Sequence, residues 1–591
     1  MTSKTMKGAD IISEYLIAER VPYVLTLSGH GNVGLLDALA QRADKIRAIG
    51  VHHEQAAGHI ADAYYRVAHK PLATITSCGP GSANLPIALA CAFYDSSAFL
   101  AITGNVPTCQ FNRGPFQETG RHHQGDFPSV IKPYVKKAFQ PTRVDMVPTA
   151  IRQAFKTMLS GRPGPVNLDV PFNVFQEEGE VEFPEPSQWR WGISSRAGGD
   201  VDSLQDVLNL LLKAEKPLIL AGHGVILSEA SDELRQLAEY LEVPVVTTPN
   251  GSGSLDSRDA LCLGPTGRNG TYQANQACRN ADVLLALGTR FCDRVSSAWI
   301  PGFTFNIPPT KLIQVDIDPD EIGRNFAPAI GILGDIRSVL RQLLSMIKEE
   351  GISRQSRPGW QKEINGWRQV WEDACSPNRS SDTVPIHPER LLADLRDVFP
   401  EDGIILADAG VHHNWIVQHW PAYRPQTVIQ SWGFSAMGFG VCGVIGAKLA
   451  RPEKKCLSVV GDYGFMMAPH IVCTAVELNL PVIWVVWNNL AQAAIKDIQT
   501  FQFEGREIVT EYCNAATGEI CSPDFVALAR ALGAEGSRVE HPGDLKAAFD
   551  TALKSDKPYV LEVMVDKGVR PVATGGWQLP PLPPMRPAFG S

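Results

Sequence analysis

Gly461-Asp462-Tyr463-Gly464-Phe465 is followed by an amphipathic run over residues 468–480 and by the apolar segment 482–487, which ends at Asn488-Asn489. This order predicts a glycine turn at the end of a strand, then a helix, then a buried parallel strand. Asp462 and Asn489 are therefore expected at the same carboxyl edge of a sheet, where open α/β sheets bind ligands. Carboxylate, amide and phosphate oxygens are the ligands that Mg²⁺ prefers. A lone Gly-Asp is usually a turn, so the spacing to the paired asparagines makes the pattern specific.

The bulk composition is that of an ordinary soluble enzyme. A chain of 591 residues is too long for one core and suggests roughly three or four domains. The 54 basic and 63 acidic residues give a net charge of −9, which argues against nucleic acid and anionic membranes as partners. No signal peptide and no apolar run of membrane-spanning length is found. The 12 cysteines form no CxxC pair, which is typical of free thiols in a reducing cytoplasm, so we expect a cytoplasmic protein.

Breaker-rich stretches divide the chain into three α/β segments. Helical patterns at 11–19 and 58–67 alternate with short apolar runs, which predicts doubly wound parallel sheets. Strands are expected at 72–76, 99–103, 166–170, 217–221, 243–247, 283–287 and 311–315. The expected units are residues 1–182, 195–350 and 383–568, followed by a proline-rich tail, 569–591, that cannot be a regular helix. A linker rich in proline and glutamate joins the first two units, and a polar stretch with three tryptophans joins the last two.

A second motif lies in the first segment, where His52-His53-Glu54-Gln55 begins a helix. Taken alone, an acidic residue there merely suits the helix dipole. Together with the motif at 461–489, it makes the chain resemble the acetohydroxyacid synthase, pyruvate oxidase and benzaldehyde lyase group of thiamine-diphosphate enzymes over most of its length. The resemblance implies a pyrimidine-binding, a central and a diphosphate-binding domain, in that order.

The resemblance also implies roles for individual residues. Glu54 would bond N1′ of the aminopyrimidine and promote the tautomer that removes the C2 proton, while the cofactor performs the carbanion chemistry. Mg²⁺ would be held by Asp462, Asn489 and the Ala491 carbonyl. The other cofactor-binding residues would be Gly79, Asn84, Ser435, Met437, Gly461, Tyr463 and Gly464. Glycines in any tight turn and a methionine filling a core are the plainer interpretations of this set.

Three positions depart from the family pattern, and one further element resembles it. Tyr463 stands where the family has a small residue, which puts the local geometry of the diphosphate loop in question. Ile498 stands where synthases have a tryptophan that selects the second oxo acid, and Phe172 stands where they have a channel lysine. Phe116-Gln117-Glu118 resembles the element that lines the synthase channel, so Gln117 is a candidate catalytic residue. The substrate site is expected to be roomier and more apolar than in synthases.

Histidines raise an alternative chemistry. His30, in Gly29-His30-Gly31-Asn32, follows the first strand, and lyase-type and dione-hydrolase-type relatives use a histidine near there for proton transfer. A group titrating near neutrality suits this task, although a lone loop histidine is more often a surface residue. The pair His122-His123 is loosely similar to the twin histidines of pyruvate decarboxylases.

The second segment resembles a central domain that binds FAD in synthases and oxidases. The stretches 247–253, 288–294 and 315–319 carry this likeness, because a strand-end aspartate can receive ribose hydroxyl hydrogens. The same features belong to any doubly wound sheet, and CoA or ADP is the rival ligand.

The leading function implied is decarboxylation of a 2-oxo acid such as pyruvate, with ligation to an acceptor carbonyl, as in acetolactate synthase. One alternative is a non-decarboxylating lyase or hydrolase that acts on an acyloin, a cyclic dione or a 2-hydroxyacyl-CoA or oxalyl-CoA type substrate. Another is a catalytically silent relative, against which the intact Glu54, Asp462 and Asn489 argue. A homodimer or homotetramer is expected, and a regulatory subunit is left open.

Overall fold

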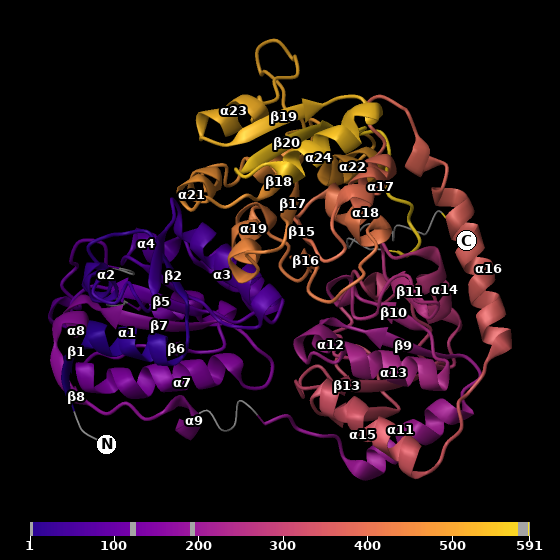
Figure 1. Ribbon diagram of the computed structural model, residues 1–591, viewed down its shortest axis with the longest axis horizontal. Helices are drawn as coiled ribbons and strands as arrows, with labels where there is room; N and C mark the ends of the chain where they lie inside the picture. The colour runs from indigo at the N-terminus through magenta and orange to yellow at the C-terminus, as the bar shows by residue number, and fades with distance from the viewer. Residues whose placement is uncertain (1–3, 119–125, 190–194, 577–588, 590–591) are drawn as a thin grey trace.

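The computed structural model describes residues 4–118, 126–189, 195–576 and 589, and within them three six-stranded parallel sheets form three domains (Figure 1). The predicted fold class of three doubly wound α/β domains is confirmed. Apolar runs such as Val283–Leu287 are buried over their whole length, as expected for parallel strands covered on both faces.

The N-terminal sheet has the strand order β3-β2-β4-β5-β7-β6. Its strands are β2 (Tyr23–Thr26), β3 (Arg47–Gly50), β4 (Ala73–Thr76), β5 (Leu100–Asn105), β6 (Ala138–Phe139) and β7 (Val166–Pro171). Its helices are α1 (Gly8–Ala18), α2 (Val33–Ala40), α3 (Glu54–Ala68), α4 (Pro80–Ala83), α5 (Pro86–Tyr94), α6 (Phe127–Ile131), α7 (Val147–Leu159) and α8 (Phe172–Gln176).

The central sheet has the order β11-β10-β9-β12-β13-β14. Its strands are β9 (Pro217–Ala221), β10 (Val245–Thr247), β11 (Cys262–Pro265), β12 (Val283–Leu287), β13 (Lys311–Asp316) and β14 (Ile330–Leu333). Its helices are α11 (Val201–Lys213), α12 (His223–Leu227), α13 (Ser231–Leu241), α14 (Tyr272–Asn280) and α15 (Ile336–Glu349).

The C-terminal sheet has the order β16-β15-β17-β18-β20-β19. Its strands are β15 (Ile404–Ala407), β16 (Val428–Gln430), β17 (Cys456–Gly461), β18 (Ile483–Asn488), β19 (Glu535–Val539) and β20 (Tyr559–Met564). Its helices are α17 (Pro388–Val398), α18 (Val411–His419), α19 (Phe439–Ala450), α20 (Asp462–Phe465), α21 (Ile471–Glu477), α22 (Ala493–Gln502), α23 (Phe525–Ala531) and α24 (Leu545–Lys554).

Two connecting stretches hold more structure than the sequence pattern indicated. The proline- and glutamate-rich linker contains β8 (Glu178–Val181), which pairs antiparallel with β1 (Lys4–Lys7). The polar stretch with the three tryptophans is a helix, α16 (Pro358–Cys375), which runs along the outside from the central to the C-terminal domain (Figure 1). It buries only a narrow stripe that includes Trp360 and Trp371, so most of its surface is polar and the helical period is weak. The prolines at 580–584 lie outside the described residues.

Helices α3 and α19 pack against each other and join the N-terminal and C-terminal domains. Glycines on α19 allow the close approach, because a Cβ atom at Gly446 would lie 2.1 Å from the Ile60 carbonyl oxygen. Side chains of both domains, such as Val67 and Val444, share one buried cluster. The first residue of α3 is Glu54, so this contact holds the start of α3 against the C-terminal domain.

A buried carboxylate, that of Asp95 after α5, connects all three domains. Its oxygens accept hydrogen bonds from Arg66 Nη2 of its own domain at 3.2 Å and from Asn250 Nδ2 of the central domain at 3.1 Å. In the C-terminal domain the backbone N–H groups of Trp432 and Gly433 donate to it at 3.1 and 2.9 Å. The Asp95 side chain is fully buried, so each of these bonds is shielded from water.

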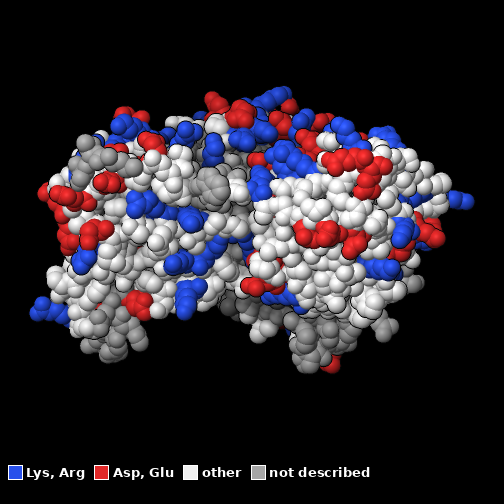
Figure 2. Space-filling model, turned by 90° about the horizontal axis from the view of Figure 1, so that it is seen from below, with Lys and Arg blue, Asp and Glu red and all other residues white. Residues whose placement is uncertain are grey.

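The charge distribution on the surface and the state of the cysteines match what the composition indicates. Figure 2 shows acidic and basic side chains interspersed on one face, with basic groups gathered where two lobes meet. All twelve cysteines lie among the described residues and are free thiols. Within the described ranges, no helix combines the length and the apolarity that a bilayer crossing requires.

Candidate active site

A cavity of about 310 Å³ opens at the carboxyl ends of β15, β17 and β18. The register pairs Gly461 of β17 with Trp487 of β18, which places the residues that follow the two strands at one edge. Asp462, Tyr463, Asn489 and the backbone at Ala491 all line the cavity. The geometry therefore brings the Asp462 and Asn489 positions together as the spacing predicts.

The Asp462 carboxylate has one free oxygen. Its Oδ1 accepts from the Tyr463 N–H at 2.7 Å, while its Oδ2 is buried without a hydrogen-bond partner. Burial raises the pKa of Asp462 to about 7, and backbone N–H groups of the loop at 489–491 oppose the rise. An orphaned carboxylate oxygen in a cavity, with an amide oxygen nearby, fits a hard cation such as Mg²⁺.

The two asparagines of the motif have different partners. Asn488 Nδ2 donates to Glu562 Oε1 at 2.7 Å inside the sheet, which is a structural bond. Asn489 lies at the cavity, and its Oδ1 accepts from the Ala491 N–H at 3.3 Å. Leu490, between Asn489 and Ala491, adopts a φ of 61°, so the chain turns sharply directly after Asn489.

Tyr463 occupies the position of the small family residue. Its ring stacks on Tyr512 with centroids 4.2 Å apart and an interplanar angle of 25°. The tyrosine ring is therefore packed against Tyr512, and Tyr463 also lines the cavity. Stacking of this kind contributes about 0.5–1.5 kcal/mol, so the turn at 461–465 is held against the segment that carries Tyr512.

The loop with Ser435 and Met437 is held at both ends. The Asp95 carboxylate binds its start, and the Asp408 carboxylate accepts from the Gly438 and Gly440 N–H groups at 3.0 Å each. Burial raises the pKa of Asp408 to about 6. Ser435 has φ of 55°, and Met437 lines the cavity. Both residues are thus presented by a restrained turn.

His412 is a site residue that the sequence analysis missed. It lies in the first turn of α18 and lines the cavity, and its Nε2 is buried without a hydrogen-bond partner. Burial lowers the pKa of His412 to about 4, so the ring is neutral and can donate one N–H. A Cβ at Gly461 would lie 3.3 Å from His412 Cε1, so glycine suits this contact. The apolar run that forms β15 (Ile404–Ala407) ends five residues before His412 and could have indicated this sheet edge, but the sequence analysis did not predict that strand.

Glu54 belongs to a second group of residues, in the N-terminal domain. It is the first residue of α3, its side chain is buried, and Asn84 Nδ2 donates to its Oε2 at 2.9 Å. A Cβ at Gly81 would lie 3.1 Å from Glu54 Oε1. At Gly79, φ is 58° and a Cβ would lie 2.5 Å from the Gln117 carbonyl oxygen, so a side chain is excluded there. These contacts bring Glu54, Gly79, Asn84 and Gln117 into one neighbourhood.

His30 joins this second group through a thiol that the sequence analysis did not single out. His30 Nε2 lies 3.4 Å from Cys78 Sγ, and the Sγ atom lies 4.0 Å from Gln117 Oε1. Burial raises the pKa of the Cys78 thiol, so it stays protonated at neutral pH. The His30 ring is exposed and contacts Phe116 at 5.8 Å between centroids. His122 and His123 lie outside the described residues.

The two groups do not line a common cavity among the described residues. The described residues that line the 310 Å³ cavity all fall between 409 and 495, so Glu54, His30 and Gln117 are not among them. Ala494 and Ile495 of α22 line the cavity, and Ile498 follows one turn later, half-buried. Phe172 begins α8 and is also half-buried.

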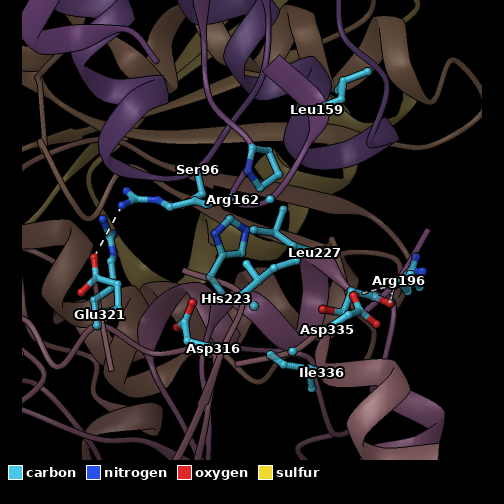
Figure 3. Close-up of a pocket in the computed structure, with 18 of the residues that line it drawn as sticks. Ser96, Leu159, Arg162, Arg196, His223, Leu227, Asp316, Glu321, Asp335 and Ile336 are labelled. Carbon is cyan, nitrogen blue, oxygen red and sulfur yellow. Dashed lines mark hydrogen bonds and ion pairs between the residues drawn. The ribbon is translucent and has the colours of Figure 1, made fainter. Parts of the chain in front are cut away.

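A second cavity, of about 330 Å³, lies between the N-terminal and central domains (Figure 3). Figure 3 shows the His223 ring at the centre of its lining side chains. Arg162 Nη1 reaches Asp318 at 3.7 Å and Glu321 at 3.5 Å across the domain boundary. Burial raises the pKa of Asp316 to about 6 and lowers that of His223 to about 3. Two of the predicted stretches contribute here, 288–294 through Arg290 and 315–319 through Asp316.

Comparison with known proteins identifies the family. Models of thiamine pyrophosphate enzymes match the chain in three parts: the N-terminal TPP binding domain at residues 6–125, the central domain at 204–343 and the C-terminal TPP binding domain at 408–563. The chain is 34% identical to the probable acetolactate synthase large subunit of Methanocaldococcus jannaschii over 95% of this chain and 92% of that relative. It is 30% identical to the acetolactate synthase large subunit of Haemophilus influenzae and to the acetolactate synthase isozyme 3 large subunit of Escherichia coli, in each case over 95% of both chains. The resemblance seen in the sequence is thereby confirmed, and the chain belongs to the thiamine pyrophosphate enzymes.

Proposed function

We propose that the protein is a thiamine-diphosphate- and Mg²⁺-dependent carboligase that decarboxylates pyruvate or a similar 2-oxo acid and transfers the remaining unit to an acceptor carbonyl. The observation that carries this proposal is the orphaned Asp462 Oδ2 beside Asn489 in a cavity at the carboxyl edge of the C-terminal sheet. The match to acetolactate synthase large subunits over nearly the whole chain supports the reaction class.

Residues of the 310 Å³ cavity would hold the metal and the diphosphate. Asp462, Asn489 and the Ala491 carbonyl would bind Mg²⁺, and the neutral His412 would donate its N–H to a phosphate oxygen. Gly461 and Gly464 keep the cavity floor open, Met437 supports the ring system, and the Ser435 carbonyl would accept a hydrogen bond from the aminopyrimidine. Once bound, thiamine diphosphate supplies a nucleophilic carbon and a place to store electrons.

The group around Glu54 and His30 in the N-terminal domain would carry out the proton transfers. The buried Glu54 carboxyl, oriented by Asn84, would share a proton with a ring nitrogen of the cofactor. His30 would deliver or remove a proton at a substrate oxygen, because its exposed ring can both accept and donate a proton. Gln117 and the Cys78 thiol contact each other near His30 and would line the substrate side.

The separation of the two groups leads us to propose a homodimer, or a tetramer built from dimers, in which Glu54 of one subunit faces the Asp462 cavity of the other. Co-expression of Glu54→Gln and Asp462→Ala subunits tests this arrangement. A mixed dimer would contain one site with both defects and one intact site, so random pairing should restore about a quarter of the wild-type activity. No recovery in the mixture would place each site within a single chain.

The function itself is tested with purified protein, thiamine diphosphate, Mg²⁺ and pyruvate. We expect CO₂ release and acetolactate, identified by mass spectrometry. C2 proton exchange without CO₂ would contradict decarboxylation. That outcome would favour the second candidate, a lyase or hydrolase that acts on an acyloin or dione. In such a reaction the exposed His30, beside Cys78, would transfer the proton.

Ile498→Trp is expected to change the acceptor preference. Ile498 lies one turn beyond the cavity-lining Ile495 on α22, so a larger ring there would narrow the space for the acceptor. We expect a shift of roughly tenfold or more in the ratio of kcat/KM values for two acceptors that differ in size. Ile508→Trp, at an exposed position, is the control. An identical product distribution would remove Ile498 from the acceptor site.

The 330 Å³ cavity is proposed to bind an adenine nucleotide. Arg162, Arg196 and Arg290 offer positive charge for phosphates, and Asp316 can accept ribose hydroxyl hydrogens. The volume lies at the lower end for ligand pockets. His223 lines both this cavity and a small one lined by Asn250 and Gln430, so we propose that the site holds an adenine nucleotide without a flavin while His223 keeps this position.

This proposal predicts the ligand of the isolated protein. Acid extraction should release an adenine nucleotide such as ADP, and the protein should lack the visible absorption of a flavin. His223→Ala should open the path and increase FAD binding. A yellow protein that releases FAD in wild-type form would contradict the assignment.

We also propose the domain boundaries expected from the sequence, 1–182, 195–350 and 383–568, with a tail at 569–591. The relatives are named as large subunits, which leads us to propose that a smaller regulatory subunit binds this chain.

A further inference from the structure

A cluster of three metal-ligating side chains lies outside both cavities described above, where α16 ends against the C-terminal domain. Cys375 is the last residue of α16, Glu389 the second of α17 and His419 the last of α18. The Cys375 thiol, one carboxylate oxygen of Glu389 and one ring nitrogen of His419 lie within 4.8 Å of one another. All three side chains are almost completely buried.

Within this cluster, the Glu389 carboxylate has an oxygen atom without a hydrogen-bond partner. Asn378 Nδ2 donates to its Oε1 at 3.0 Å, but its Oε2 is buried without any hydrogen-bond partner. The nearby Arg379 forms its ion pair with Glu372 instead, at 2.8 and 3.1 Å. His419 Nε2 lies 3.2 Å from Gln418 Oε1 but 3.9 Å from Glu389 Oε1, so the histidine makes no hydrogen bond to the glutamate. A buried carboxylate in this state is either protonated or compensated by a cation.

The surroundings hold the ligands in place and leave a way in. The His419 ring stacks on Trp371 at 5.8 Å between centroids and contacts the tilted ring of Trp415 at 5.4 Å, which restricts its orientation. A cavity of about 460 Å³ is lined by Glu389, His419 and Trp371. It offers an entry path and room for a fourth, exogenous ligand.

We propose that Cys375, Glu389 and His419 bind a transition-metal dication, most readily Zn²⁺, at a site separate from the Mg²⁺ site. One sulfur, one nitrogen and one oxygen ligand suit zinc, whereas Mg²⁺ prefers oxygen alone. A thiolate and a carboxylate balance the dication. Zinc bonds of about 2.0–2.3 Å require the ligand atoms to draw in by roughly 1 Å, which side-chain torsions at helix ends allow. Bound metal would fasten α16 to the C-terminal domain.

Cobalt(II) tests the site, because a cysteine thiolate bound to Co²⁺ gives a charge-transfer absorption that Mg²⁺ sites do not give. Chelator-treated full-length protein is loaded with thiamine diphosphate and Mg²⁺ and then titrated with Co²⁺. We expect a thiolate band that saturates at about one ion per chain and disappears when Zn²⁺ is added. Cys375→Ser should lose the band, and Cys473→Ser, a half-buried cysteine elsewhere, should keep it.

A second variant keeps the test decisive if Cys375→Ser does not fold. Glu389→Gln preserves the shape and the acceptor for Asn378, and it should weaken Zn²⁺ binding at least tenfold in competition with a chromophoric chelator. Asp462→Ala should leave the cobalt band unchanged, which separates this site from the proposed catalytic metal. Absence of the band in the wild-type protein, or a band unchanged in Cys375→Ser, would overturn the proposal, as would equal Zn²⁺ affinity of Glu389→Gln and wild type.

Discussion

Glu54→Gln should fold and bind thiamine diphosphate, yet turn over pyruvate about 10²–10⁴ times more slowly than the wild type, the range that a lost acid–base group produces. Glutamine has the size of glutamate, so the neighbourhood of Asn84 and Gly81 stays filled. An amide cannot share a proton with a pyrimidine nitrogen, so deprotonation of the cofactor at C2 slows. The contact between α3 and α19 is untouched, because Glu54 only begins that helix.

Two readouts check this result. Hydrogen–deuterium exchange at C2 of the bound cofactor, followed by NMR, reports the proton step, and calorimetry reports cofactor affinity. Glu349→Gln, at an exposed position at the end of α15, is the matched control and should behave as the wild type. Exchange at the normal rate in Glu54→Gln would take Glu54 out of the proposed proton step.

Asp462→Ala should lose Mg²⁺-dependent uptake of thiamine diphosphate by roughly 100-fold or more, because it removes the single charged ligand proposed for the metal. Asp462 begins α20 directly after β17, and its Oδ2 is buried without a hydrogen-bond partner. Removing the side chain therefore breaks the bond from the Tyr463 N–H and the weaker interactions with the backbone N–H groups at 489–491. Calorimetric titration with the cofactor in Mg²⁺ buffer measures the loss. The exposed Asp550→Ala is the control, and normal uptake by Asp462→Ala would refute the metal assignment.

The proposed metal ligand also predicts how cofactor uptake changes with pH. The pKa of Asp462 is raised to about 7 without the metal, so below pH 7 the carboxyl is mostly protonated. A cation binds the deprotonated form, and protons compete with it. Uptake should therefore weaken as the pH falls from 8 to 6, approaching a tenfold loss per pH unit below the pKa. Asp462→Asn should lose this dependence together with most of its affinity.

The sequence was most informative where one segment determines its own structure. Buried parallel strands read as continuous apolar runs, so β9 and β12 begin and end where the pattern predicts. The spacing from Asp462 to Asn489 contains a whole strand–helix–strand unit, and this unit brings its two ends to one edge. The predicted helix over 468–480 is shorter in the structure, α21 (Ile471–Glu477), because turns at both ends replace helical bonds.

Features that depend on distant contacts could not be predicted in this way. The helix α16 has a mostly polar sequence, and its narrow apolar stripe makes sense only beside the domains that it covers. His412 and Cys78 are candidate site residues because they are buried and because they contact residues remote in the chain. The separation of Glu54 from the Asp462 cavity is likewise a property of packing, which no local pattern records.

The Asp95 carboxylate has a consequence for how the molecule unfolds. Its four hydrogen-bond donors come from three domains, and opening any one domain would leave a buried charge with lost partners, which typically costs 3–5 kcal/mol. The shared cluster under α3 and α19 adds a second penalty to partial opening. Three sheets that could each have been an independent cooperative unit are thus coupled into one, so heat should melt them in a single calorimetric transition. Weakening the central domain alone would then lower the melting temperature of the domains that carry the chemistry.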